Sequence, residues 1–185
     1  IGLIDCCGFA RADQSAAADA ASSVAREARG RLFMAVTANP LATEAAVEIL
    51  RAGGTAADAA IAAQLVLNLV EPQSSGLGGG GFLLYHDART GRLHAYDGRE
   101  TAPAAARPER FLGADGKPLP FHEAAVGGRS VGVPGLPALL EMVYRNHGRS
   151  PWPKLFAPAL RLAVEGFPLS PRLHKLLAED RFLRD

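Results

Sequence analysis

Arg99 is a candidate binding residue, because two carboxylates, those of Asp97 and Glu100, flank its guanidinium in the sequence. Such a cluster can be a surface ion-pair network at a strand end. Alternatively, the neighbouring acids hold the arginine so that its planar fork grips a substrate carboxylate with two hydrogen bonds. The residue types alone leave both interpretations open.

A candidate nucleophile, Ser130, lies in the segment Gly128-Arg129-Ser130-Val131-Gly132, which matches the pattern G-x-S-x-G. In hydrolases with this motif the serine occupies a tight turn between a strand and a helix, and an acid and a histidine follow later in the chain. Acids and histidines do follow, at Glu141, His147, Glu165, His174 and Asp180. The Gly, Val and Pro residues around Ser130 favour an extended loop instead, so a serine hydrolase remains an alternative.

Glycines 76, 78 and 81 match the pattern G-x-G-x-x-G. The dinucleotide-binding form of this motif needs a strand before it and a helix after it, so that a phosphate meets a helix N-terminus. Here the pattern predicts the reverse order, and no lysine follows to make a P-loop. We therefore expect a turn in which backbones approach closely, or one whose N–H groups face a developing negative charge.

Composition argues against several other classes of function. The five histidines show no metal-ligand spacing with one another or with Cys6 and Cys7, and the adjacent cysteines are expected to be free thiols. A net charge of +1 and an aromatic content of 6% give no reason to expect a nucleic-acid partner. No apolar run is long enough to span a bilayer. We expect no cofactor and no metal.

The elements that must position these residues begin with two helices. Residues 32–38 are an apolar run that predicts a buried strand. Asn39 and Pro40 then predict a helix start, and this helix runs to Ala52 before a pair of glycines. Thr55 with Asp58 forms a capping box for a second helix.

That second helix, residues 56–70, is apolar nearly all round and is expected to be buried. Its polar exceptions, Gln64 and Asn68, are four residues apart and are expected to pair with each other or with the backbone. A hairpin is predicted from residues 82–86 and 92–97.

The second half of the chain is predicted to be a loop followed by helices. Residues 102–127 are rich in Pro, Ala and Gly and predict a long surface loop. Further helices are predicted at 136–146, from Ser150-Pro151 to Gly166, and from Ser170-Pro171 onward. Pro158 is expected to kink the middle one of these or to delay its start.

The chain has 185 residues, of which 48% are hydrophobic and 21% charged, as in globular proteins. Residues 1–31 are rich in Ala, Ser and Asp, begin with Ile and not Met, and are interpreted as a leader or a loosely docked segment. Residues 32–185 are interpreted as the regular domain.

Several motifs occur in one order along the chain: Asn39-Pro40-Leu41-Ala42-Thr43, Gly53 to Ala60, Glu71 to Gly81, Asp97-Gly98-Arg99-Glu100-Thr101-Ala102-Pro103, and Ser130 to Gly135. This order resembles that of the gamma-glutamyltranspeptidases, over residues 32 to about 170. Residues 32–185 resemble the N-terminal portion of the large subunit of that family.

The resemblance implies an N-terminal-nucleophile hydrolase. The implied fold class is α+β, as part of a four-layer αββα sandwich that is incomplete in this chain. Such a precursor cuts itself into two subunits, and the new N-terminal threonine of the small subunit is the nucleophile, with its own amine as base. The enzyme takes the gamma-glutamyl group from amides such as glutathione and passes it to water or to an amino acid.

By the same resemblance, Arg99 binds the alpha-carboxylate of the glutamyl substrate, and Glu100 orients it. No catalytic residue is expected within the chain, because none of its threonines occupies the family's processing position. The expected partners are the rest of the large subunit, the small subunit and gamma-glutamyl compounds, and a periplasmic or secreted location is favoured over a cytoplasmic one. A related acylase of the same superfamily and a non-catalytic truncated homologue are the alternatives, beside the serine hydrolase.

Overall fold

The computed structural model describes residues 29–180 and residue 182. The chain divides into two compact units, residues 1–34 and residues 35–185, and the helices and strands of the described residues all lie in the second. The leader predicted for residues 1–31 lies almost wholly outside the described residues, as do Cys6 and Cys7. The boundary at residue 31 therefore stays a prediction.

The first two helices have the ends that the sequence predicts. Helix α1 (Pro40–Arg51) begins after Asn39, whose side chain accepts a hydrogen bond from the backbone N–H of Leu41. Gly53 follows with a φ of 85°, a left-handed conformation that glycine adopts without strain. Helix α2 (Ala56–Val70) begins with the complete capping box of Thr55 and Asp58.

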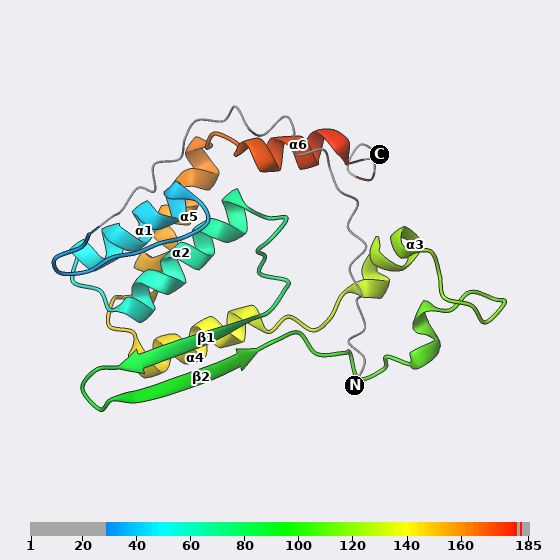
Figure 1. The fold of residues 1–185 in the computed structure, drawn as a ribbon, viewed down its shortest axis with the longest axis horizontal. Helices are drawn as coiled ribbons and strands as arrows, with labels where there is room; N and C mark the ends of the chain where they lie inside the picture. Colours follow the sequence, from blue (N-terminus) through cyan, green and yellow to red (C-terminus); the bar gives the residue numbers. More distant parts are fainter. Residues whose placement is uncertain (1–28, 181, 183–185) are drawn as a thin grey trace, which may run out of the picture. The chain divides into compact units, whose positions relative to one another are not determined.

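Helix α2 is the centre of the core, as its all-round apolar surface predicts. It packs against α1 and against two later helices, α4 (Leu136–His147) and α5 (Trp152–Glu165). Figure 1 shows α1, α2 and α5 side by side. The buried core mixes alanines with larger apolar residues, and the fully buried ones among the larger residues are Ile61, Val66, Val70, Val143 and Leu155.

The predicted hairpin is present. Strands β1 (Gly81–Asp87) and β2 (Arg92–Gly98) are antiparallel, with Leu84 opposite Ala95. Their alternate residues Leu83, Tyr85 and Tyr96 pack against the core, on the side where Figure 1 places α4 beside the hairpin. The described part of the chain is thus α+β, with helices and one two-stranded sheet.

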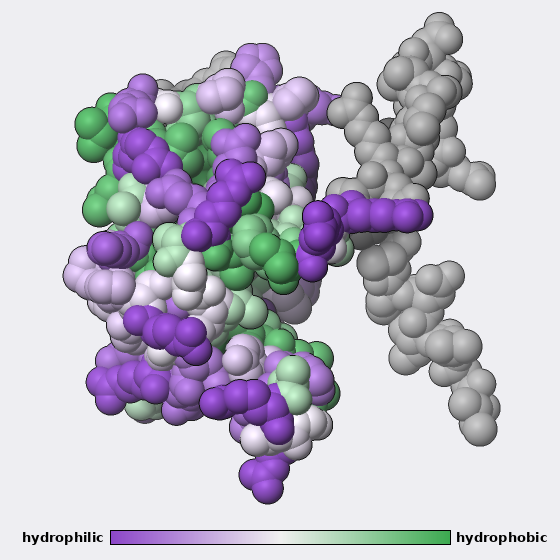
Figure 2. Space-filling view, turned by 90° about the vertical axis from the view of Figure 1, so that its left-hand side faces the viewer, coloured by the Kyte–Doolittle hydropathy of each residue, from purple (hydrophilic) through white to green (hydrophobic). Residues whose placement is uncertain are grey.

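The other face of the hairpin carries exposed apolar side chains. Phe82, Leu84 and Leu93 remain 69%, 70% and 64% exposed. Figure 2 shows hydrophobic residues reaching the surface between hydrophilic ones on one side of the molecule. Among the described residues, no helix is long and apolar enough to cross a membrane.

The prediction of a strand at residues 32–38 is wrong, because these residues form no regular element in the structure. A strand exists only when its N–H and C=O groups have a partner strand, and in the described part of the chain β1 and β2 pair only with each other. The apolar run therefore has no ladder to join.

Proline 158 does not delay its helix, because α5 begins at Trp152 and includes Pro158. A proline inside a helix removes one backbone hydrogen bond. Here its ring is fully buried, and this apolar burial offsets part of the lost bond. The last helix, α6 (Pro171–Glu179), begins after the predicted cap Ser170.

The segment between β2 and α4 is not one continuous loop. It contains two short 3-10 turns, η2 (Pro108–Phe111) and η3 (Gly128–Ser130), and one short helix, α3 (Phe121–Ala125). None of the three buries a residue, so the prediction of a surface segment is confirmed.

A buried carboxylate, Asp58, joins the start of α2 to the connection between α4 and α5. Besides the Thr55 N–H at 2.9 Å, it accepts hydrogen bonds from the N–H groups of Arg149, at 3.1 Å, and Ser150, at 3.0 Å. Burial by itself raises the pKa of this carboxyl, but these N–H donors outweigh it and hold the pKa below the ordinary 3.8. Asp58 is therefore charged and fully paired at neutral pH.

Replacing Asp58 with Asn should lower the free energy of unfolding by about 2–4 kcal/mol, because an amide group would face backbone donors in the interior. Chemical denaturation measures this loss. Asp115→Asn, at an exposed turn, is the matched control and should change little. Equal stability of the two variants would contradict the role given to Asp58.

The same loss should depend on pH in a defined direction. Because the folded-state pKa of Asp58 is lowered, its stabilisation is full above the ordinary pKa of 3.8 and is lost as the pH falls through the folded-state pKa. The advantage of the natural protein over Asp58→Asn should therefore shrink in acid and stay constant toward neutral pH.

Candidate substrate-binding site

Three segments that contain glycine meet around Arg99: the loop of residues 76–81, the end of β2, and residues 132–135. A Cβ atom on Gly80 would lie 2.7 Å from the Glu100 nitrogen and 2.8 Å from the Arg99 Cα. A Cβ atom on Gly135 would lie 2.7 Å from the Arg99 carbonyl oxygen. The close approach of backbones expected for this loop is therefore confirmed.

Backbone hydrogen bonds fix the three segments to one another. The N–H groups of Gly135 and Leu136 both donate to the carbonyl oxygen of Gly79 at 3.0 Å. Thr101 and Val133 exchange two hydrogen bonds as an isolated bridge. The backbone on both sides of Arg99 is thus held by contacts that do not depend on its side chain.

The side chain of Arg99 forms an ion pair with Glu100, at 3.0 Å between Nη1 and Oε2. The Arg99 side chain is 59% exposed and that of Glu100 is 29% exposed. The Oε2 atom is buried, and its contact with Arg99 lies outside hydrogen-bond geometry. Among the described residues no hydrogen-bond acceptor engages the Arg99 side chain, so most of its donors are available to another acceptor.

Asp97 does not hold the guanidinium, which is the role that its position beside Arg99 suggests. Its carboxylate accepts a hydrogen bond from the backbone N–H of Arg99 at 2.9 Å. It caps the end of the strand, and of these two acids it is Glu100 that forms the ion pair with the guanidinium. The sequence could not separate these roles, because both acids are adjacent to Arg99 in the chain.

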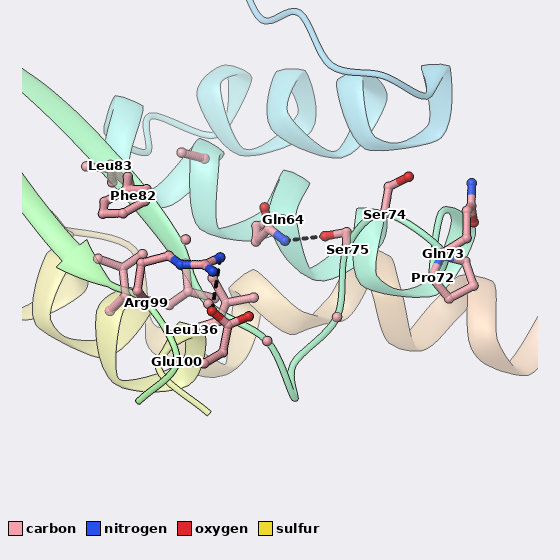
Figure 3. A pocket seen from close by; sticks show the side chains of 17 residues that line it. Gln64, Pro72, Gln73, Ser74, Ser75, Phe82, Leu83, Arg99, Glu100 and Leu136 are labelled. Carbon is pink, nitrogen blue, oxygen red and sulfur yellow. Dashed lines mark hydrogen bonds and ion pairs between the residues drawn. The ribbon is translucent and has the colours of Figure 1, made fainter. Parts of the chain in front are cut away.

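A cavity of about 520 Å³ opens beside Arg99. Its lining comes from α2, the glycine loop, the start of β1 and the first turn of α4 (Figure 3). Gln73, Ser74 and Ser75 contribute polar groups, whereas Leu136, Leu139 and Leu140 contribute apolar ones. Such a cavity suits a small molecule that carries both a charged group and an aliphatic chain.

The polar residues of α2 near this cavity form a network. Gln64 donates to Asn68 at 2.9 Å and to the Ser75 hydroxyl at 2.5 Å, and Ser75 donates to Asn68 at 2.9 Å (Figure 3 shows the Gln64–Ser75 bond). The predicted pairing of Gln64 with Asn68 is confirmed. The network ties the glycine loop to the core helix.

Ser130 lies at the end of η3 and not in a strand–turn–helix elbow. Its hydroxyl donates to the carbonyl oxygens of Ala125, at 2.6 Å, and Gly127, at 3.3 Å. The next helix, α4, begins only at Leu136. This hydroxyl is committed to backbone acceptors, whereas a serine nucleophile needs a hydrogen bond to a base.

A histidine cluster that the sequence did not single out lies on the core side of the hairpin. His147 stacks on Tyr85, and its Nε2 lies 2.7 Å from the Tyr96 hydroxyl. Burial and the neighbouring His94 lower the pKa of His147. Within the described residues, no group of three His, Cys, Asp or Glu side chains could hold a metal ion.

Replacing Gly80 with Ala should lower the free energy of unfolding by about 2 kcal/mol or more, because the new methyl group meets backbone atoms that cannot move aside. Gly76→Ala in the same loop is the control, since nothing lies within 4 Å of its Cβ position. That variant should stay within about 0.5 kcal/mol of the natural protein. Denaturant titration distinguishes the two, and an equal effect would contradict the close approach at Gly80.

Comparison with known proteins identifies the family. The family model for gamma-glutamyltranspeptidase matches residues 42–185. The chain is 41% identical over 150 residues to the glutathione hydrolase proenzyme of Bacillus subtilis strain 168, covering 81% of this chain and 26% of that protein. It thus spans about a quarter of the length of this curated relative.

Solved structures agree. The gamma-glutamyltranspeptidase of Helicobacter pylori superposes with a TM-score of 0.78 at 34% identity, over 86% of this chain and 46% of that one. A cephalosporin acylase from Bacillus halodurans superposes with a TM-score of 0.67 at 35% identity, over 84% of this chain and 29% of that one. By sequence and by fold, the chain belongs to the gamma-glutamyltranspeptidase family.

Proposed function

We propose that this chain provides the carboxylate-binding part of the active site of a gamma-glutamyltransferase. The whole enzyme would cleave gamma-glutamyl amides such as glutathione and pass the glutamyl group to water or to an amino acid. The observation that carries the proposal is the half-exposed guanidinium of Arg99, which has one carboxylate neighbour and lines a cavity of substrate size. Family membership supports the reaction class.

Arg99 would bind the alpha-carboxylate of the glutamyl group through two parallel N–H donors. Glu100 contacts Nη1 and so limits the directions in which the guanidinium can turn. The glycine-bearing segments hold the backbone of Arg99 in place before any substrate arrives. A preorganised arginine loses little conformational entropy on binding, which favours affinity.

The nucleophile of the proposed reaction is an N-terminal threonine from outside this chain. Its hydroxyl attacks the gamma-carbonyl carbon while its own amine takes the proton, and the amide C–N bond then breaks with that proton passing to the leaving amine. Water or an amino acid releases the glutamyl group from the ester. Within this chain, the Thr37 and Thr43 hydroxyls lie 2.8 Å apart at the start of α1, which supports a structural part for both.

An acylase acting on another acyl group is the second candidate, because the chain resembles a solved cephalosporin acylase. The two candidates differ in whether the acyl group carries a free alpha-carboxylate. The free donors of Arg99 favour a substrate that does.

Arg99→Ala, made in the enzyme that contains both subunits, should lower kcat/KM for a gamma-glutamyl amide by about 100-fold, because two charge-assisted hydrogen bonds are lost. For the matching 4-aminobutanoyl amide, which keeps the amine but lacks the alpha-carboxylate, the variant should change kcat/KM little. Arg89→Ala, at the far end of the hairpin, is the control. Equal losses on both amides would favour the acylase instead.

This chain by itself should not hydrolyse a gamma-glutamyl anilide, because it would lack the nucleophile. The measurement is release of the anilide chromophore by the purified chain and by the two-subunit enzyme at equal molar concentrations. Turnover by the chain alone that Arg99→Ala abolishes would place the nucleophile within these residues and would overturn this part of the proposal.

A further inference from the structure

A cluster of tyrosine and histidine rings joins the hairpin to α4, and the proposed reaction does not use it. Tyr85 comes from β1, His94 and Tyr96 come from β2, and His147 is the last residue of α4. All four are half-buried, and Tyr85 is opposite His94 in the strand register. The cluster is therefore part of the contact between the hairpin and the helix, which lie side by side in Figure 1.

His147 is the centre of this cluster. Its ring stacks on that of Tyr85, with 3.8 Å between the two ring centroids. The ring of His94 lies edge-on to it, with 5.3 Å between the centroids. Neutral rings at these distances attract one another as aromatic groups, whereas two imidazolium rings repel each other.

The hydrogen bonds of Tyr96 favour a neutral His147. The side-chain amide of Asn146 donates to the Tyr96 hydroxyl oxygen at 3.1 Å. The hydroxyl proton is then available to Nε2 of His147, 2.7 Å away, and this nitrogen accepts a hydrogen bond only when it carries no proton. Protonation of Nε2 makes both partners donors, so the hydroxyl proton loses its acceptor.

The charged groups of the strands act on His147 in opposite directions. Burial, and after it His94, opposes a charge on His147, whereas Asp87 at the end of β1 favours one. The opposing effects are the stronger, and the pKa of His147 lies below the ordinary 6.5. Arg92, which is opposite Asp87 in the register, is exposed on the same face of the hairpin.

The charged side chains of the helices beside the cluster are engaged elsewhere. The titratable residue of α2, Asp58, binds backbone N–H groups in the connection between α4 and α5. On α4, Arg145 pairs with Glu141, and both side chains are exposed. None of these three groups is among those that shift the pKa of His147.

The opposite end of the hairpin is held by close contacts of glycines. A Cβ atom on Gly98 would lie 2.6 Å from the Cβ of Leu139, and the Gly135 N–H donates to the carbonyl oxygen of Gly79 at 3.0 Å. These contacts contain no titratable group, so we expect them to be insensitive to pH.

We propose that the cluster is a pH-sensitive attachment between the hairpin and α4. While His94 and His147 are neutral, it holds the turn end of the hairpin on the helix. When both become charged in mildly acidic solution, this end separates from α4, whereas the end at Gly98 stays packed. The inference goes beyond the proposed function and does not rest on it, because it concerns only the packing of the strands.

The direction of the pH dependence follows from the lowered pKa of His147. The attachment has its full strength above the ordinary pKa of 6.5 and weakens as the pH falls from there through the folded-state pKa. A two-stranded hairpin without a packed face is marginally stable in water, so the separated end opens its strand hydrogen bonds.

Hydrogen–deuterium exchange of the two-subunit enzyme, read by mass spectrometry of its peptides, tests this inference. Exchange is compared at about pH 7.5 and about pH 5.5, on either side of the titration of histidine, after correction for the intrinsic pH dependence of exchange. Protection of residues 83–95 should fall about fivefold at the lower pH, whereas residues 40–70 should keep theirs. The double variant His94→Gln/His147→Gln, which stays neutral at both values, should reduce the fall to less than about twofold.

His86→Gln is the matched control, because His86 lies on the same hairpin but is exposed on its other face. This variant should retain the full pH effect. His94→Gln and His147→Gln made singly should each give a smaller fall than the natural enzyme, which keeps the test decisive if the double variant does not fold. A natural enzyme without the fall, a fall that persists without the two histidines, or an equal fall in residues 40–70 would overturn the inference.

Discussion

The structure around the candidate site depends on one constraint, the distance between backbones at Gly80, Gly98 and Gly135. A Cβ atom on Gly98 would lie 2.6 Å from the Cβ of Leu139, and one on Gly80 or Gly135 would meet backbone atoms of the β2 end. No other residue type fits at these distances. The absence of side chains lets the glycine loop, the strand end and the start of α4 lie directly against one another, and so fixes where Arg99 stands.

Buried carboxylates connect the helices that support this region. Asp58 binds the N–H groups that lead into α5, and Glu71 accepts from the side chain of Asn39 at 2.9 Å, which joins the end of α2 to the start of α1. The hydrogen bond from Asn39 is the main cause of the lowered pKa of Glu71. Each charge is satisfied by donors at a helix end, so burial is compatible with ionisation. These hydrogen bonds hold α1, α2 and the residues that lead into α5 together.

Electrostatics and shape together make Arg99 the candidate substrate-binding residue among the described residues. Its guanidinium has one acidic neighbour, remains open to solvent and lines two cavities, of about 520 and 800 Å³. The first cavity mixes serine and glutamine side chains with leucines, whereas the second carries further arginines.

The sequence by itself determined the local features and the family. The caps at Asn39, Thr55 and Ser170 and the hairpin turn follow from interactions within a few residues, which the backbone imposes wherever these residue types occur. Only the tertiary structure decided which acid beside Arg99 contacts its guanidinium, that residues 32–38 have no partner strand, and that Arg107, Arg110 and Arg129 meet in one cavity. These outcomes depend on segments that are distant in the chain, and residue spacing does not encode how closely such segments approach.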